Sequence, residues 1–188
     1  MNQIISFFLK FTDKQYSTFR KLASMIPGII VFLVLSPFVI FHISAFFSGV
    51  LSIHTPRIFE LVVTICALLI SIPLMFKAFF DLWIIGEGSP APIAPTKHLV
   101  TTGAYSWCRN PIELGTNLYF LALGIFFDSL TTGIFCMLLG LTLGTGYIKL
   151  IEEKEMLLRF GSPYKEYLKR VPFMTLPYLS LTRAYKHE

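Results

Sequence analysis

The stretch that decides the fold is residues 112–148, IELGTNLYFLALGIFFDSLTTGIFCMLLGLTLGTGYI. Its first half carries a single charge and its second half carries none. A helix needs about 20 predominantly apolar residues to cross a membrane, and each half approaches that length. The dipeptide Asp128-Ser129 separates the two halves. We therefore predict two antiparallel spanning helices, residues 112–127 and 130–148, joined by a tight turn.

Two further apolar stretches precede this hairpin and add two spans. Residues 26–47 have His42 as their only strongly polar side chain, and residues 58–80 are interrupted by Pro73. Residues 1–21 instead mix Ile and Phe irregularly with Lys and Arg, a pattern typical of an amphipathic helix at the membrane surface. A tilted fifth span over these residues stays open, so the sequence predicts four or five spans.

The composition also indicates a membrane protein. Hydrophobic residues make up 54% and charged residues 14% of the 188 residues, whereas soluble domains average about 25% charged residues. This balance excludes a disordered chain, and the odd number of cysteines excludes a disulfide-stapled secreted domain. We therefore predict an all-α integral membrane protein, a polytopic helical bundle with four or five transmembrane helices.

The basic residues predict which side of the bundle faces the cytoplasm. With four spans, all but one of the 16 Lys and Arg lie on the same side, and Arg57 is the exception. Cytoplasmic segments carry the excess of Lys and Arg, so we expect both termini and the central loop to be cytoplasmic. The net charge of +5 then lies beside anionic lipid. We expect no nucleic-acid partner and no metal.

Small residues on the last predicted helix indicate close helix packing. Gly140 and Gly144 are four residues apart, and Gly133 lies further back on the same helix. Small residues at this spacing let two membrane helices approach closely. We prefer this packing role to a role in ligand binding.

Candidate functional side chains concentrate in the central loop between the second and third spans. Proline and glycine residues keep this loop from forming a long helix, and Pro111 then stands at a helix-start position. The second half of the loop carries donors and rings: His98, Tyr105, Trp107, Arg109 and Asn110. Their concentration indicates a binding site rather than a simple connection.

The hairpin places the acidic end of the last span opposite this loop. From Pro111 to Asp128 the chain rises about 26 Å at about 1.5 Å per residue, and an equal descent reaches Gly146. The next two turns carry Glu152, Glu153 and Glu155. We therefore expect the polar loop and these acidic turns to converge at the cytoplasmic mouth of the bundle.

Glu152 is the carboxylate expected to face inward. Glu153 and Glu155 each have a basic residue four positions away, so both resemble solvated ion pairs. Glu152 instead has apolar residues four positions away on both sides. A carboxylate on an apolar face needs a partner, either Arg109 as a brace that closes the bundle or a bound cation. Both partners stay open.

Two blocks of this polar region resemble a known family. The run LVTTGAY, residues 99–105, followed by RNP at residues 109–111 and by Gly115, is similar to the signature of isoprenylcysteine carboxyl methyltransferases. A second block, residues 152–172, resembles the closing segment of that family. Related membrane phospholipid N-methyltransferases share parts of both blocks. The resemblance covers roughly residues 95–177 and indicates the superfamily more strongly than the acceptor.

The resemblance implies S-adenosylmethionine as methyl donor, with S-adenosylhomocysteine as product, in a cytoplasm-facing cofactor pocket. We expect one membrane domain, residues 1–188, with an interfacial helix and the first spans in residues 1–90 and a cofactor-binding catalytic half in residues 91–188. By position, the family's cofactor contacts fall on Lys97, His98, Leu99, Val100, Tyr105, Asn110, Pro111, Glu113 and Glu152. The catalytic candidates are Arg109, Glu113 and Glu152.

The chain departs from the family pattern at two positions of the first block. Asn110 stands where the family has histidine, and Glu113 stands where it has tyrosine. The arginine that the family places before its acidic pair is also missing, because Ile148 and Lys149 occupy that region. Donor binding survives these changes more easily than the identity of the acceptor does.

The side-chain chemistry agrees with this donor independently of the resemblance. Arg109 or His98 can pair with the carboxylate of the donor. Glu152 can accept from its ammonium or its ribose, and Tyr105 or Trp107 can lie against its adenine or its sulfonium. Methyl transfer is an in-line displacement, so alignment of the reactants should contribute more than acid–base catalysis.

We expect an integral membrane methyltransferase that uses S-adenosylmethionine, with carboxyl O-methylation of a prenylcysteine-type acceptor entering from the bilayer as the first interpretation. N-methylation of a phospholipid or another amphiphile is the alternative, with Glu113 or Glu152 assisting loss of the amine proton. A small transporter would place ionisable residues at mid-membrane, where only His42 comes near. A non-enzymatic membrane scaffold also stays open, and it predicts no cofactor affinity.

Overall fold

The computed structural model describes residues 18–51, 53–90 and 94–175. Within these ranges every regular element is a helix, which confirms the all-α prediction. In chain order the elements are α2 (Thr18–Ile30), η1 (Val31–Leu35), α3 (Ser36–Ser48), α4 (Arg57–Ile84), η2 (Gly103–Ser106), α5 (Pro111–Phe127), α6 (Leu130–Tyr147), η3 (Ile148–Glu152) and α7 (Glu153–Arg170). The elements η1 and η3 are π-helical turns, and η2 is a 3-10 turn.

Three helical stretches in the described ranges are long and apolar enough to cross a membrane, and α5 is a shorter apolar helix. The three stretches are Met25–Ser48, Arg57–Ile84 and Leu130–Arg170. They contain the predicted spans 26–47, 58–80 and 130–148, whereas the predicted span 112–127 corresponds to the shorter α5. The predicted turn lies between the end of α5 and the start of α6. The predicted interfacial helix falls mostly outside the described residues, since only its last four residues belong to α2.

The chain divides into two compact units that interleave along the sequence. The first unit takes its described residues from 18–26, 76–112 and 147–175, and the second unit consists of residues 27–75 and 113–146. Each unit therefore combines segments that are distant in sequence. The predicted division at residue 90 follows the chain instead, and it stays a prediction.

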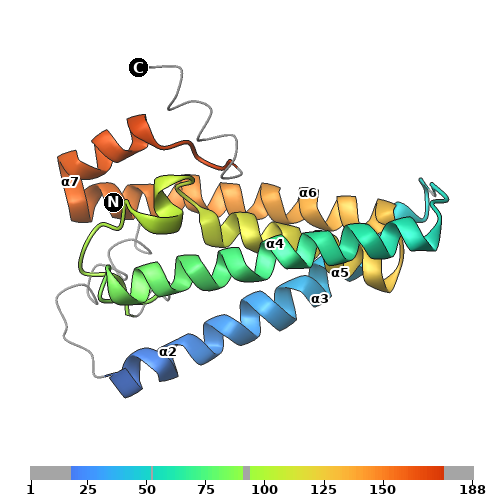
Figure 1. Ribbon diagram of the computed structural model, residues 1–188, viewed down its shortest axis with the longest axis horizontal. Helices are drawn as coiled ribbons and strands as arrows, with labels where there is room; N and C mark the ends of the chain where they lie inside the picture. Colours follow the sequence, from blue (N-terminus) through green and yellow to red (C-terminus); the bar gives the residue numbers. More distant parts are fainter. Residues whose placement is uncertain (1–17, 52, 91–93, 176–188) are drawn as a thin grey trace. The chain divides into compact units, whose positions relative to one another are not determined.

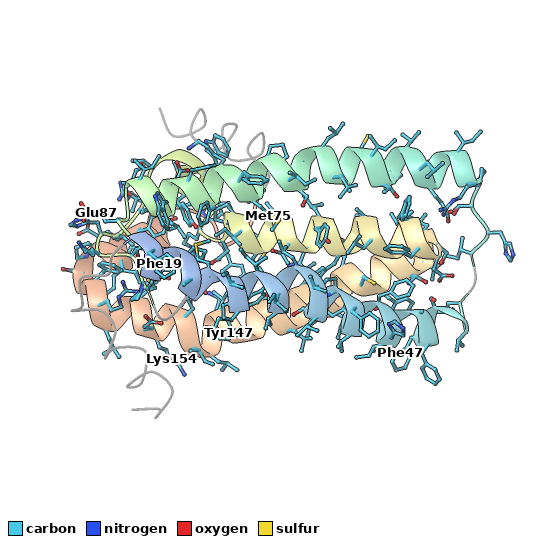
Figure 2. The ribbon with its side chains drawn as sticks, turned by 90° about the horizontal axis from the view of Figure 1, so that it is seen from below. Phe19, Phe47, Met75, Glu87, Tyr147 and Lys154 are labelled. Atoms are coloured by element: carbon cyan, nitrogen blue, oxygen red, sulfur yellow. The ribbon has the colours of Figure 1, made fainter. Side chains whose placement is uncertain are left out.

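The second unit is a bundle in which α3, α4, α5 and α6 run alongside one another (Figure 1). Ile40, Phe120 and Cys136 are buried at its core, and Phe41, Tyr119 and Leu139 pack against them. Large apolar side chains also cover the outside, where Phe47 points away from the ribbon of α3 (Figure 2). An exposed apolar surface of this kind is expected where the surrounding solvent is lipid.

Glycines bring α5 and α6 into close contact inside this unit. A Cβ atom on Gly124 would lie 2.6 Å from the Cα atom of Gly133, and one on Gly140 would lie 2.7 Å from the Phe120 ring. A Cβ atom on Gly144 would overlap the carboxylate of Glu113. Real Cβ atoms essentially never lie this close to other atoms, so the predicted packing role is confirmed for Gly133 and Gly140, whereas the carboxylate beside Gly144 is the end of a flexible side chain.

The first unit contains the polar end of the molecule. It combines the last turns of α4, the loop that carries η2, and the helix formed by η3 and α7. Gly161 has a φ of 57° and ψ of −126°, and its non-helical conformation interrupts α7. Because this φ is unfavourable for residues with a Cβ atom, glycine permits the turn there. The rest of α7 therefore folds back, as Figure 1 shows, and residues 171–175 follow it.

Candidate functional site

The central loop begins by folding onto the end of α4. The backbone N–H groups of Lys97 and His98 both donate to the carbonyl of Gly86, at 2.7 and 3.3 Å. The Lys97 ammonium lies 3.1 Å from a carboxylate oxygen of Glu87, a residue visible in Figure 2, and the His98 ring lies 3.8 Å from the other oxygen. Both basic side chains are exposed, whereas Val100 is buried.

Tyr105 lies in the 3-10 turn η2 and is buried. Its backbone carbonyl accepts a hydrogen bond of 2.7 Å from the hydroxyl of Tyr167 on α7. Burial raises the pKa of the Tyr105 hydroxyl well above its usual range, and the negative charge of Glu152 adds to this effect. The hydroxyl is therefore protonated at neutral pH and is available as a hydrogen-bond donor.

Arg109 pairs with Glu153. Its Nη1 atom lies 3.0 Å from Oε1 of Glu153, and the Lys149 ammonium lies 2.7 Å from the same oxygen. The side chain of Glu153 is only 15% exposed. The prediction that Glu153 forms a solvated pair with Lys149 was therefore right about the partner and wrong about the surroundings. One carboxylate here compensates two cations.

A second predicted solvated pair is also buried. Arg159 and Glu155 lie 3.2 Å apart, as their spacing of four residues predicts, but each side chain is only 10% exposed. Arg159 also donates to the backbone carbonyl of Thr96 in the central loop. This pair joins α7 to the loop. Both side chains are shielded from water at that junction, whereas the sequence predicted a solvated pair.

The segment of residues 171–175 closes over the second half of the loop. The Arg109 N–H donates to the carbonyl of Pro172 at 3.0 Å, and the Asn110 side-chain amide donates to the carbonyl of Phe173 at 3.0 Å. The Thr175 hydroxyl donates to the carbonyl of Trp107 at 3.1 Å. These bonds position the backbone around Arg109 and Asn110, the two residues that precede Pro111 in the family-like run.

Phe173 also covers the cations of this region. Its ring centroid lies 5.5 Å from the guanidinium carbon of Arg109 and 4.5 Å from the Lys149 ammonium. Both distances are within the range of cation–π attraction. Cys108 is buried beside this segment, and its burial raises the pKa of the thiol. It is a free cysteine.

The first unit therefore brings most of the candidate residues together. It contains Lys97, His98, Leu99, Val100, Tyr105, Arg109, Asn110, Pro111 and Glu152. Glu113 belongs to the second unit, where its carboxylate accepts a hydrogen bond of 2.7 Å from the side chain of Asn117. Within the described ranges, no group of three or more His, Cys, Asp or Glu side chains is placed to hold a metal ion.

Two residues of this region escaped the sequence analysis as candidates. Asp81 on α4 is buried and accepts a hydrogen bond from the backbone of the loop. Tyr167 belongs to the second family-like block but carried no expected role. A signal for Asp81 was available, because Lys77 lies four residues before it on the same helix, at the spacing of an ion pair.

Comparison with protein families gives one match. The profile described as phospholipid methyltransferase matches residues 59–162, which is more than half of the chain. No curated protein and no solved structure matches the chain. The matched family is related to the isoprenylcysteine carboxyl methyltransferases that the two sequence blocks resemble. The chain therefore belongs to the phospholipid methyltransferase family, whose members are membrane methyltransferases.

Proposed function

We propose that the chain transfers a methyl group from S-adenosylmethionine to a lipophilic acceptor, and that the first unit binds the donor. One observation carries this proposal. Tyr105, Arg109 and Asn110 of the loop lie in one unit with the acidic residues that follow α6, and Arg109 contacts Glu153 directly. The chain thus gathers aromatic, cationic and anionic groups from distant segments of the sequence.

The residues present fit the donor. The Nε atom of Arg109 is buried and has no hydrogen-bond partner among the described residues. A buried N–H group without a hydrogen-bond partner is energetically costly unless a ligand binds it. The carboxylate of S-adenosylmethionine can accept this hydrogen bond. The carboxylate of Glu152 can accept from the ammonium or the ribose of the donor. The hydroxyl of Tyr105 can donate a hydrogen bond to S-adenosylmethionine.

The chain's own contribution to the reaction is orientation and exclusion of water. When bound, S-adenosylmethionine supplies an activated methyl group, and the transfer cancels the positive charge on its sulfur. Arg109 and Glu152 would orient the donor by its charged ends, which aligns the methyl group for in-line attack. Phe173 and the rest of the 171–175 segment cover the cations and limit access of water from that side.

The acceptor class has two candidates, each supported by a different observation. A prenylcysteine-type carboxylate is our first candidate, because both sequence blocks resemble the isoprenylcysteine enzymes and a carboxylate needs no base. The amine of a phospholipid is the second, because the matched family carries that substrate in its description.

The distribution of Lys and Arg supports a cytoplasmic location of both termini and of the donor site. Soluble S-adenosylmethionine would then arrive from the cytosol, while the acceptor arrives from the bilayer. A scaffold or a transporter would need neither the buried Nε–H group of Arg109 nor the family's closing segment. The proposed function therefore makes a direct prediction about donor binding.

Calorimetry with S-adenosylhomocysteine tests the donor site on the purified full chain in detergent. We expect binding by the wild type and weaker binding by Glu152→Gln, which keeps the size of the side chain and removes its charge. Glu166→Gln is a matched control, because Glu166 is an exposed carboxylate on α7. Wild-type protein that folds but does not bind would contradict the proposal.

A radiolabelled methyl-transfer assay then separates the acceptors. N-acetyl-S-farnesylcysteine tests the carboxylate, and phosphatidylethanolamine in mixed micelles tests the amine. Product from the first only supports our first candidate, and product from the second only replaces it with the amine. Donor binding without transfer to either lipid would exclude both acceptor classes while leaving the donor site intact.

A further inference from the structure

The last turns of α4 hold a buried carboxylate that contacts the loop of the proposed donor site. Asp81 is 6% exposed, and its Oδ2 atom accepts a hydrogen bond of 2.7 Å from the backbone N–H of Ala104. The ammonium of Lys77, one helical turn earlier, binds the other oxygen. A buried carboxylate is tolerated when both of its oxygens have partners, and Asp81 satisfies that condition.

The shape of the loop depends on this carboxylate. Gly103 has a φ of 62°, in the left-handed region that glycine adopts readily. A Cβ atom at Gly103 would overlap the carboxylate group of Asp81. Glycine is therefore required at this position for its backbone conformation and also for the approach of Asp81. This contact gives a physical reason for the glycine in the run LVTTGAY.

The turn η2 is consequently held from two sides. Asp81 binds the N–H of Ala104, and the Tyr167 hydroxyl binds the carbonyl of Tyr105, the next residue, at 2.7 Å. Ala104 itself is completely buried, so its side chain adds packing to these two hydrogen bonds. All of these residues lie in the first unit.

From these contacts we infer that Asp81 is a positioning residue for the proposed donor site, because it holds the η2 turn in the geometry that places Tyr105. Lys77 supports it by compensating the buried charge while remaining half exposed itself. The inference rests on the proposed function, because the turn would be positioned for the binding of S-adenosylmethionine.

Two substitutions at Asp81 separate its charge from its hydrogen bond. Asp81→Asn keeps a side-chain oxygen for the Ala104 N–H, whereas Asp81→Ala removes it. Because misplacement of a site by about 1 Å can cost about 100-fold, we expect Asp81→Ala to weaken S-adenosylhomocysteine binding about tenfold or more. Asp81→Asn should restore most of that affinity. Glu166→Gln, at an exposed carboxylate in the same unit, should bind like the wild type.

Hydrogen exchange measured without ligand reports the turn directly. Peptides that cover residues 99–107 should exchange faster in Asp81→Ala than in the wild type and in Asp81→Asn, while peptides from α6 stay unchanged. Gly103→Ala is a second route to the same turn, because its methyl group would displace the turn from an intact Asp81. It should also lose donor affinity. If Asp81→Ala does not fold, Gly103→Ala and Asp81→Asn decide the question.

The outcomes distinguish this inference from the proposed function. If the wild type binds S-adenosylhomocysteine and both Asp81→Ala and Gly103→Ala bind it equally well, Asp81 is only a structural residue and the inference is wrong. The inference is also wrong if Asp81→Asn loses as much affinity as Asp81→Ala, because the hydrogen bond would then not be the cause. If the wild type itself does not bind, the proposed function fails, and the inference fails with it.

Discussion

Arg57 and Glu60 form an ion pair of 3.1 Å at the start of α4, and this pair caps two other helices. Arg57 donates to the carbonyls of Ile125 and Phe126 at the end of α5, at 3.1 and 2.7 Å. Glu60 accepts from the N–H of Leu130 at the start of α6, at 2.9 Å. Backbone carbonyls at the end of α5 and an N–H group at the start of α6, which have no partners within their own helices, thus bind charged side chains.

The first prediction concerns Arg57, the single basic residue that we expect on the non-cytoplasmic side from the distribution of Lys and Arg. Arg57→Ala removes two hydrogen bonds to helix-terminal carbonyls and leaves the buried Glu60 without its cation. Hydrogen bonds to charged groups contribute about 1.5–3 kcal/mol, and the half-exposed position of Arg57 reduces that value, so we expect a loss of about 1–2 kcal/mol. The check is equilibrium unfolding in mixed detergent and SDS micelles, followed by circular dichroism.

Arg57→Lys supplies the control for this measurement. It keeps the positive charge beside Glu60 but cannot bind two successive carbonyls with a planar group. We therefore expect a stability between those of the wild type and Arg57→Ala. Equal stability of all three proteins would show that the pair does not hold the hairpin turn.

The second prediction concerns the contact between α5 and α6. Gly133→Ala would place a Cβ atom 2.6 Å from the backbone carbonyl oxygen of Leu121, which cannot move aside without moving its helix. Overpacking of this kind costs about 1–3 kcal/mol. Gly146→Ala is the matched control on α6, because its Cβ atom would meet nothing within 4 Å. The control should retain or gain stability, since alanine is the better helix former. Comparable losses in both variants would argue against the close contact.

The helical hairpin was predictable because its signals are local. A run of apolar residues, a polar dipeptide and a proline at a helix start each act within a few positions. The turn at Asp128-Ser129 and the start of α5 at Pro111 accordingly lie where the sequence predicts them. The small residues Gly133 and Gly140 were also informative, because close packing of membrane helices requires that they lack side chains.

The partner of Arg109 was harder to predict, and the reason is a change in helix geometry. The expectation that Glu152 faces inward, with Arg109 or a bound cation as its partner, assumes a regular α-helix through this region. The structure instead contains the π-helical turn η3, Ile148–Glu152, which rotates the following residues relative to an α-helix. Glu153 thus faces Arg109. The contact between Asp81 and Ala104 was also hidden, because its partner is a backbone N–H that no side-chain pattern reveals.

The third prediction uses the buried thiol of Cys108. Burial raises its pKa, and hydrogen bonds from the backbone of Thr175 and Asn110 offset only part of this effect. The folded protein therefore keeps the thiol proton at pH values at which the unfolded chain, with a thiol pKa of about 8.5, releases it. Unfolding then releases a proton, so the stability contributed by the neutral thiol decreases as pH rises above that value.

Cys108→Ala should remove this dependence. Between about pH 8 and 10, near and above the ordinary thiol pKa, the wild type should lose stability more steeply than the variant. Below about pH 7.5 the thiol is protonated in both the folded and the unfolded protein. The plots of stability against pH for the wild type and the variant should therefore run parallel there, which provides an internal control. Thermal unfolding in detergent across this range is the measurement. Parallel curves over the whole range would mean that the thiol titrates alike in both states.

The last prediction concerns Tyr167, whose hydroxyl binds the carbonyl of Tyr105. Tyr167→Phe removes one oxygen atom from a buried side chain and leaves that carbonyl without its donor, which should cost about 1 kcal/mol of stability. If the turn carries the proposed donor site, affinity for S-adenosylhomocysteine should fall as well. Tyr119→Phe is the matched control, because its hydroxyl donates to the carbonyl of Leu33 at 3.4 Å within the second unit. A loss of donor affinity that is equal in both variants would reflect general destabilisation, whereas a loss confined to Tyr167→Phe would locate the effect at the turn that carries Tyr105.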